Sequence, residues 1–193
     1  MSKLPISFYT RPDVVQLSRE LLGKVLCTHI GGALTEAVIV ETEAYAGVAD
    51  RASHAYGGKR TKRTEMMYWS GGHAYIYLCY GMYSLFNVVT NIEGIPHAAL
   101  IRGGVPLSGL DAMLARLKKT KAVPGLLSGP GKLAKALGLH YSMTGTPLSG
   151  NRIWIEDRNI HIPANAITAT PRIGVDYAGE DAALPYRFVA TLQ

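Results

Sequence analysis

The chain has 193 residues, of which 48% are apolar and 18% are charged, a composition typical of a soluble globular domain with a full core. No run approaches the roughly 18 apolar residues of a membrane span, and the segment 1–6 lacks the apolar core of a signal peptide. The formal net charge of +6 favours polyanionic partners such as nucleic acid or an acidic membrane surface.

The first elements are predicted to be one helix and two paired strands. Thr10-Arg11-Pro12 opens the helix with Thr10 as a possible cap, and Gly23 can end it. The segments 24–30 and 33–45 are predicted strands, joined by a hairpin turn at Gly31-Gly32.

A long loop is predicted at 46–63, where glycine, lysine and arginine dominate. A loop of that length in a compact domain is usually functional or disordered. A helical turn at 64–68 follows, and the alternation beyond it predicts strands at 73–79, 82–91 and 97–105.

The second half is predicted to contain two helices and several short strands. One helix spans 108–121, and a second begins in the run 126–133 with Ser128 as its cap. The further strands are 152–156, 166–169, 172–175 and 186–190. The pattern predicts an α+β fold with much antiparallel pairing, in a single domain that spans residues 1–193.

The two cysteines indicate a reducing compartment. Cys27 and Cys79 lie in separate apolar strand-like runs, which favours buried thiols over a disulfide or a metal pair. We therefore expect a cytoplasmic protein.

Carboxylates lie at the end of the second predicted strand. Residues two apart share a strand face, so Ile39, Glu41, Glu43 and Tyr45 are predicted to point one way. Two carboxylates at a solvated strand end would be unremarkable chemically. A carboxylate beside an aromatic face, however, would lie in a partly desolvated cleft, where its pKa rises and it can act as a base.

The predicted loop carries a histidine and a basic cluster. His54 is of interest if the loop folds back over Tyr45, and is otherwise incidental. Possible phosphate contacts are Lys59, Arg60, Lys62 and Arg63, together with Lys132 in the Ser-Gly-Pro-Gly-Lys run. The basic end of the helix at 116–121 is either a further phosphate contact or a solvated helix terminus.

The stretch 68–87 is rich in tyrosine and has no formal charge. Tyr75 and Tyr77 share one strand face and could stack on a planar ligand or be half-buried strand residues. Tyr80 stands just before Gly81 at a break between strands, where an exposed aromatic could act as a wedge between bases. The Asn87 amide could read a base edge or simply tie two strands together.

Other common catalytic devices lack their parts. No His, Cys, Asp and Glu set has zinc spacing, and the sequence has neither a phosphate-binding glycine loop nor a Gly-x-Ser-x-Gly elbow. A carboxylate, a tyrosine-lined pocket, a wedge and basic flanks suit an enzyme that flips a base from duplex DNA and hydrolyses it from its sugar.

Several segments in order resemble the alkyladenine (3-methyladenine) DNA glycosylase family in a compact bacterial form. The resemblance runs from about Leu4 to Phe188. The matching segments are Glu41-Thr42-Glu43-Ala44-Tyr45, His54, Tyr75-Ile76-Tyr77-x-x-Tyr80-Gly81-Met82-Tyr83, Asn87, Leu100-Ile101-Arg102, Ser128-Gly129-Pro130-x-Lys132-Leu133 and the run from Pro171 to Gly179.

The resemblance implies a curved, mostly antiparallel sheet flanked by helices, distinct from the helix-hairpin-helix glycosylases. It also implies a monofunctional, metal-free and cofactor-free enzyme that removes 3-methyladenine, 7-methylguanine, hypoxanthine or ethenoadenine from double-stranded DNA. By position it assigns Glu43 as the general base and Arg102 as the residue that helps to place the water.

The remaining roles implied by the resemblance concern base extrusion and selection. Tyr45, His54 and Tyr77 correspond to the walls that stack on the flipped base. Tyr80 corresponds to the wedge in the duplex, and Asn87 to the group that rejects normal guanine.

One departure from the family pattern follows Arg102. Gly103-Gly104-Val105 stands where the family usually has alanine and an acidic residue, which could soften the support of Arg102. Two alternatives stay open: a non-catalytic protein that binds damaged DNA, and a nucleoside or glycan hydrolase that uses Glu41 and Glu43 as a carboxylate pair.

Overall fold

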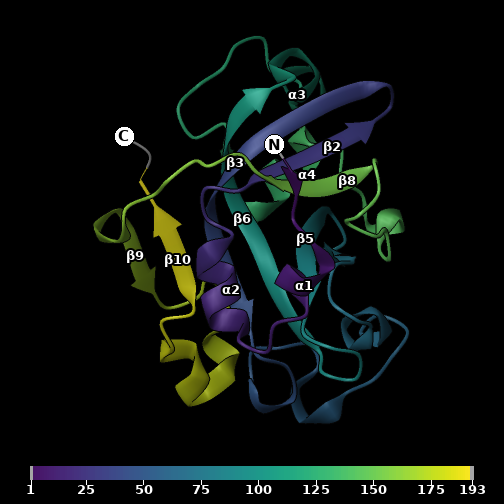
Figure 1. The fold of residues 1–193 in the computed structure, drawn as a ribbon, viewed down its shortest axis with the longest axis vertical. Helices are drawn as coiled ribbons and strands as arrows, with labels where there is room; N and C mark the ends of the chain where they lie inside the picture. The colour runs from purple at the N-terminus through teal and green to yellow at the C-terminus, as the bar shows by residue number, and fades with distance from the viewer. Residues whose placement is uncertain (1, 192–193) are drawn as a thin grey trace.

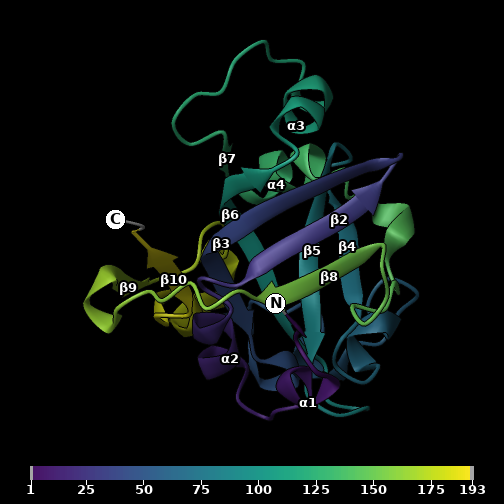
Figure 2. The same ribbon diagram turned by 45° about the horizontal axis from the view of Figure 1, so that its top comes forward.

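Ten strands form one curled sheet, which Figures 1 and 2 show from two directions. The computed structural model describes residues 2–191. Seven strands lie in the order β1-β8-β2-β3-β6-β5-β4, while β10 pairs with β3, β9 with β10, and β7 with β6. All of these pairs are antiparallel, which confirms the predicted α+β fold. The strands are β1 (Ser2–Lys3), β2 (Val25–Ile30), β3 (Ala33–Tyr45), β4 (Ala74–Cys79), β5 (Tyr83–Thr90), β6 (His97–Ser108), β7 (Leu127–Ser128), β8 (Ile153–Asp157), β9 (Ile167–Thr170) and β10 (Arg187–Ala190).

Helices flank this sheet at its two ends (Figure 2). The α-helices are α1 (Ile6–Tyr9), α2 (Val14–Glu20), α3 (Leu110–Leu117) and α4 (Pro130–Ala136). The main core joins Leu17 of α2 and Leu133 of α4 to Phe86 and Ile101 of the central strands. Burial of this apolar surface is the main force that holds the helices on the sheet. Within residues 2–191, no helix is long and apolar enough to cross a membrane.

The pairing of β3 with β6 becomes irregular where the carboxylates begin. Ile39 and Glu41 pair with adjacent residues of β6, so Val40 between them has no partner of its own. An extra residue of this kind reverses which side chains point to which face. Ile39 accordingly packs in the main core, and the prediction that it shares a face with Glu41 is wrong. Glu43 and Tyr45 do share a face, as the hydrogen bond between their side chains shows.

The hairpin between β4 and β5 ends in a strained turn. The amide of Met82 donates to the carbonyl of Cys79 at 3.0 Å, and the two residues between them, Tyr80 and Gly81, have φ values of 50° and 69°. A left-handed conformation costs a non-glycine residue roughly 1–2 kcal/mol. The turn therefore holds the Tyr80 side chain away from the sheet at some cost, and this side chain is 86% exposed.

Two helix boundaries differ from those predicted. The helix predicted to open at Thr10 is α2, which begins at Val14, because the Asp13 side chain caps it by accepting from the Gln16 amide at 2.9 Å. The helix predicted to reach Lys121 ends at Leu117, since the left-handed Lys118 (φ 55°) stops it.

Two further predictions are wrong for local reasons. Ser128 belongs to β7 and does not cap α4, which instead follows Gly129 in an extended, positive-φ conformation. The segment 172–175 is a turn rather than a strand, because the Arg172 side chain is bound to Asp50 and the Ile173 amide to Glu43.

Gly109, which precedes α3, provides a test of the fold. Its φ is 75°, and a Cβ there would stand 2.2 Å from the carbonyl oxygen of Leu34. We expect Gly109→Ala to lower the free energy of unfolding by roughly 2–4 kcal/mol. The Leu34 backbone must move away from the added Cβ, and alanine must adopt a strained positive φ.

Gly31→Ala is the matched control, and urea unfolding measures the free energy of unfolding of both variants. Gly31 also has a positive φ, of 64°, but no atom lies within 4 Å of the added Cβ. It should lose only about 1 kcal/mol. Equal losses in the two variants would contradict the proposed backbone contact.

Candidate active site

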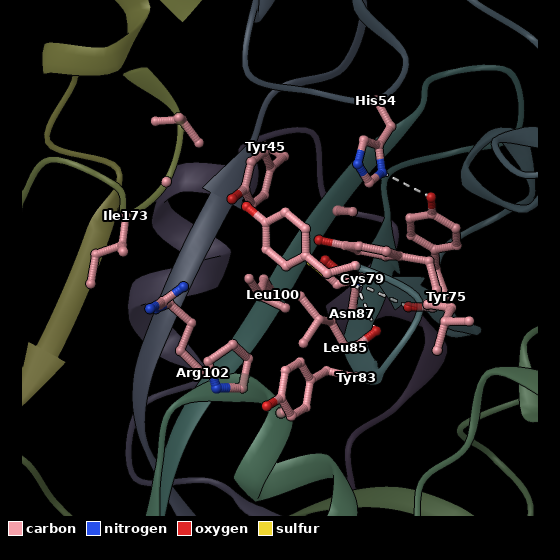
Figure 3. A pocket seen from close by; sticks show the side chains of 18 of the residues that line it. Tyr45, His54, Tyr75, Cys79, Tyr83, Leu85, Asn87, Leu100, Arg102 and Ile173 are labelled. Carbon is pink, nitrogen blue, oxygen red and sulfur yellow. Dashed lines mark hydrogen bonds between the residues drawn. The ribbon is translucent and has the colours of Figure 1, made fainter. Parts of the chain in front are cut away.

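A cavity of about 700 Å³ opens among β3, β4, β5, β6 and the segment 171–177 (Figure 3). Its volume lies within the usual range of small-ligand pockets. Among the residues that line it are Tyr45, His54, Arg63, Tyr75, Tyr77, Tyr80, Asn87, Leu100, Arg102, Lys132, Ile173 and Tyr177. The cavity thus brings together all of the predicted base-pocket residues with Arg102 and Tyr80.

Glu43 lies directly behind this cavity wall and is completely buried. Its Oε2 accepts a hydrogen bond from the Tyr45 hydroxyl at 2.8 Å, and its Oε1 accepts one from the Ile173 amide at 2.8 Å. The Nε of Arg102 is 3.4 Å from the same Oε1. Two hydrogen bonds and an adjacent guanidinium on one carboxylate favour its ionised form and fix its orientation.

Burial raises the pKa of Glu43 above its ordinary value. The charge of Arg102, the Ile173 amide and the Tyr45 hydroxyl oppose that shift, while the nearby charge of Glu41 adds to it. A carboxylate with a raised pKa accepts a proton more readily than an exposed one. Glu43 is therefore suited to act as a base.

Glu41 orients Arg102 and does not act as a second free carboxylate. Its Oε1 accepts from the Nε of Arg102 at 3.0 Å and from the Nε of Arg187 at 2.7 Å. Within the described residues, the only hydrogen bond of the Arg102 side chain uses Nε. Its terminal nitrogens are thus available on the side of the cavity that Arg102 lines.

The glycines after Arg102 allow close packing around Glu41. A Cβ on Gly103 would stand 3.0 Å from Glu41 Oε2 and 3.1 Å from its Cβ. A Cβ on Gly104 would stand 3.1 Å from Leu133. The departure from the family pattern is thus matched by a close approach of β6 to the residue that orients Arg102.

The aromatic walls come from three separate segments. Tyr45 ends β3, Tyr77 lies in β4, and His54 comes from the loop between these strands, which folds back over the cavity (Figure 3). The rings of His54 and Tyr77 meet edge to face with centroids 4.6 Å apart. Edge-to-face contact is a favoured geometry for two aromatic rings and helps to fix them in the cavity wall.

His54 is held as a neutral ring with both nitrogens occupied. The guanidinium of Arg63 donates to Nε2 at 2.9 Å, so Nδ1 carries the proton and donates to the Tyr75 hydroxyl at 3.0 Å. Burial and the charges of Arg63 and Lys59 lower the pKa of His54 to about 4. His54 consequently presents a ring edge rather than a free acid or base.

Asn87 is buried on β5 with its amide fixed by the backbone. Nδ2 donates to the carbonyls of Tyr75 at 3.1 Å and Leu85 at 3.3 Å (Figure 3). These two bonds use both amide hydrogens and hold the amide rigidly in the cavity wall. The amide thus ties β5 to β4, and its place in the cavity wall is compatible with a contact to a base.

The tip of the β4–β5 hairpin is an exposed apolar surface at the mouth of the cavity. Tyr80 is 86% exposed, and Leu78, Met82 and Tyr83 are exposed beside it. Apolar side chains at such a tip are unfavourable in water unless they meet a partner. The geometry suits the predicted wedge.

The predicted phosphate contacts fall into three environments. Lys59 and Lys62 are exposed, whereas Arg60 is paired with Glu65 and stacks over the Tyr68 ring. Arg63 lies over the Tyr77 ring at 4.8 Å and lines the cavity. Lys132 also lines the cavity, from the first turn of α4.

Sequence reasoning missed the contributions of Ile173 and Arg172. The Ile173 amide reaches Glu43 across 130 positions of sequence, and a backbone amide carries no residue-type signal. Arg172 is completely buried against Asp50, far from any charge cluster in the sequence. Only the resemblance of the run 171–179 pointed to this segment, without a role for either residue.

Within residues 2–191, no group of three or more His, Cys, Asp or Glu side chains is placed to hold a metal ion. Cys27 is buried as predicted, and burial raises the pKa of its thiol to about 12. Cys79 is only half-buried and lines the cavity.

Comparison with known proteins decides the family. The model of the methylpurine-DNA glycosylase family matches residues 7–193. The chain belongs to this family. A relative from Chlamydia abortus is 47% identical over 187 residues, which cover 96% of this chain and 97% of the relative. A relative from Desulfitobacterium hafniense is 43% identical over 195 residues, covering 97% and 95%, and one from Bacillus cereus is 43% identical over 192 residues, covering 95% and 93%.

These three relatives are provisionally named 3-methyladenine DNA glycosylases. Membership makes the chain a DNA glycosylase, a hydrolase whose substrate is DNA.

The His54 environment gives a prediction that NMR can test. Removal of the Arg63 charge in Arg63→Ala should raise the pKa of His54 from about 4 toward its ordinary value of 6.5, because a repulsive cation is lost. The measurement is the pH titration of the His54 ring resonance.

The lowered pKa of His54 also makes the stability of the protein depend on pH. A histidine whose folded pKa lies below its unfolded pKa contributes stability that is present above the unfolded pKa and is lost as pH falls from the unfolded toward the folded pKa. Arg63→Ala should therefore lose less stability than wild type between pH 6.5 and 4. An unchanged titration of His54 would refute the contact.

Proposed function

We propose that the protein flips an alkylated or deaminated purine out of duplex DNA and hydrolyses its N-glycosidic bond with water activated by Glu43. The proposed bases are 3-methyladenine, 7-methylguanine, hypoxanthine and ethenoadenine. The enzyme is proposed to act as a monomer on the nucleoid in the cytoplasm, as the first step of base excision repair.

The observation that carries this proposal is the placement of Glu43. A completely buried carboxylate lies directly behind an aromatic cavity of about 700 Å³. Such a cavity accommodates a single base, and its tyrosine walls suit stacking.

The proposed chemistry needs only groups that this chain supplies. The bond from C1′ to the purine nitrogen breaks with its electron pair on the purine, so a cationic alkylated base leaves neutral and a neutral base takes up a proton from solvent as it leaves. The negative charge of Glu43 stabilises the oxocarbenium-like sugar, and Glu43 then accepts a proton from water as the water oxygen adds to C1′. Arg102, whose Nε is held by Glu41, is assigned the placement of that water.

Base selection is assigned to the cavity walls. Tyr45, His54 and Tyr77 enclose the flipped purine by stacking and edge contacts. Because the Asn87 amide is fixed by two backbone carbonyls, it cannot swing away from a guanine 2-amino group. A steric conflict at this rigid group would exclude normal guanine.

Two other functions are less well supported. A protein that only binds damaged DNA would not need a completely buried carboxylate with two oriented hydrogen-bond donors and an adjacent guanidinium. A hydrolase that uses Glu41 and Glu43 as an acid and base pair would need a free Glu41, whereas Arg102 and Arg187 both occupy its Oε1.

Glu43→Gln tests the assignment of the base. Glutamine keeps the size of the side chain but cannot accept the proton, so base release should fall by at least roughly 100-fold. The measurement is single-turnover release from duplexes that carry each of the four bases, with a chelator present. Binding to the same duplexes should change less than about threefold.

Wild-type release that stops with the chelator would contradict metal-independent chemistry. Release by Glu43→Gln at the wild-type rate would exclude Glu43 as the base.

Tyr80→Ser tests the wedge. Loss of the exposed ring should weaken binding to a damaged duplex by roughly 1–3 kcal/mol, the scale of one base–aromatic stack. Release from a single-stranded substrate should be nearly unchanged, because its base is already unstacked.

Tyr56→Ser is the control, since Tyr56 is 47% exposed but does not line the cavity. Equal effects of the two substitutions on duplex binding would remove the wedge assignment.

The salt dependence of binding tests the predicted phosphate contacts. Lys62→Gln should reduce the slope of log K against log salt by about 0.9, the value of one phosphate contact. Arg60→Gln should reduce it by less, because Glu65 already pairs with Arg60. Fluorescence anisotropy across salt concentrations measures both slopes, and a wild-type response that is flat would refute all the basic contacts.

A further inference from the structure

A buried ion pair lies beside the Tyr45 ring and has no part in the mechanism above. The side chains of Arg172 and Asp50 are 0% and 2% exposed. Nη1 and Nη2 of Arg172 donate to the two carboxylate oxygens of Asp50 at 2.5 Å and 2.9 Å. Asp50 also accepts from the backbone amides of Ala46 and Ala52, at 2.9 Å and 3.0 Å.

The same guanidinium holds the strand that carries Glu43. Nη1 also donates to the carbonyl of Ala44 at 2.9 Å, between Glu43 and Tyr45 in the chain. The guanidinium carbon lies 4.9 Å from the centre of the Tyr45 ring, which forms a wall of the cavity. Arg172 thus fixes the backbone and the ring at the end of β3 together.

The position of Arg172 also determines where the next residue lies. The Ile173 amide follows it directly and donates to Glu43 Oε1 at 2.8 Å. Nη2 of Arg172 also donates to the carbonyl of Asp181 at 3.1 Å, which holds the guanidinium against its own segment of the chain. One side chain therefore links the loop after β3, the end of β3 and the segment 171–181.

We propose that the Arg172–Asp50 pair is a positioning device that aligns the Ile173 amide with Glu43 and the Tyr45 ring with the base. This inference rests on the proposed role of Glu43 and extends it to two residues that touch neither the substrate nor the reacting atoms. Without the pair, the carboxylate would lose an oriented donor while keeping its burial.

The cost of the pair supports a role beyond stability. Buried ion pairs are often no more stabilising than apolar residues of the same volume. The Nε of Arg172 is moreover buried without a hydrogen-bond partner within the described residues. A buried donor left unpaired is unfavourable, so this arrangement is expected where geometry matters more than stability.

The pH dependence of base release distinguishes positioning from stability. The charged or titratable groups around Glu43 are Glu41 and Tyr45 from β3, Arg102 from β6, Tyr77 from β4, Arg187 from β10 and Arg172. The Ile173 amide lowers the pKa of Glu43, so its displacement should raise that pKa further. The acid limb of the rate should then move to higher pH.

Arg172→Lys is the test variant, because lysine keeps the charge but cannot bind Asp50 and Ala44 with the same fork. We expect the maximal single-turnover rate to fall roughly 10- to 100-fold, as for a misplaced catalytic group, with the acid limb shifted to higher pH. Half-saturation by duplex DNA should change less than about threefold. Asp50→Asn, which keeps the shape of Asp50, is the second variant if Arg172→Lys fails to fold, and should shift the limb in the same direction.

Arg158→Lys is the matched control. Arg158 is a half-buried arginine bound to Glu36 and Glu156 outside the cavity lining, so its substitution should lower the melting temperature without moving the acid limb. A folded Arg172→Lys with the wild-type limb and rate would overturn the inference while leaving Glu43 as the base. Absence of base release by the wild type would instead overturn the proposed function itself.

Discussion

The arrangement of the site depends on one carboxylate, that of Glu43, being held away from water. Glu43 is completely buried, yet the Tyr45 hydroxyl, the Ile173 amide and Arg102 surround it with donors. Burial alone would favour the neutral acid, and strong pairing alone would make the carboxylate a poor base. The site lies between these limits, because Arg102 uses its Nε mainly on Glu41 and stands farther from Glu43.

The rest of the fold positions the groups around that carboxylate. The irregular pairing of β3 with β6 turns Glu41, Glu43 and Tyr45 away from the main core. The loop after β3 folds back to place His54 on the cavity, and the β4–β5 turn projects Tyr80 at its mouth. In the proposed function, the β4–β5 hairpin extrudes the base, walls from β3, β4, β5 and the loop after β3 select it, and Glu43 of β3 carries the chemistry.

The sequence predicts those features that depend on local pattern. Alternation and turn residues located β2, β3, β4, β5 and β6, and the spacing of Glu43 and Tyr45 predicted their common face. The bulge at Val40 was not predictable, because it arises from pairing with β6 and leaves no mark in residue type. The same limit applies to the Ile173 amide, which reaches Glu43 across 130 positions. Segment 172–175 has the residues of a strand, but the side chain of Arg172 binds Asp50 and a turn forms instead.

The central claim is that Glu43 is a buried base whose pKa is raised. The most direct test is the wild-type rate of single-turnover release from a 7-methylguanine duplex between about pH 4 and 9. That substrate is already cationic, so its departure does not require protonation by the enzyme. We expect the release rate to rise with pH through one acid limb, at a pKa above the ordinary glutamate value of 4.5. A rate independent of pH, or a limb at or below 4.5, would contradict it.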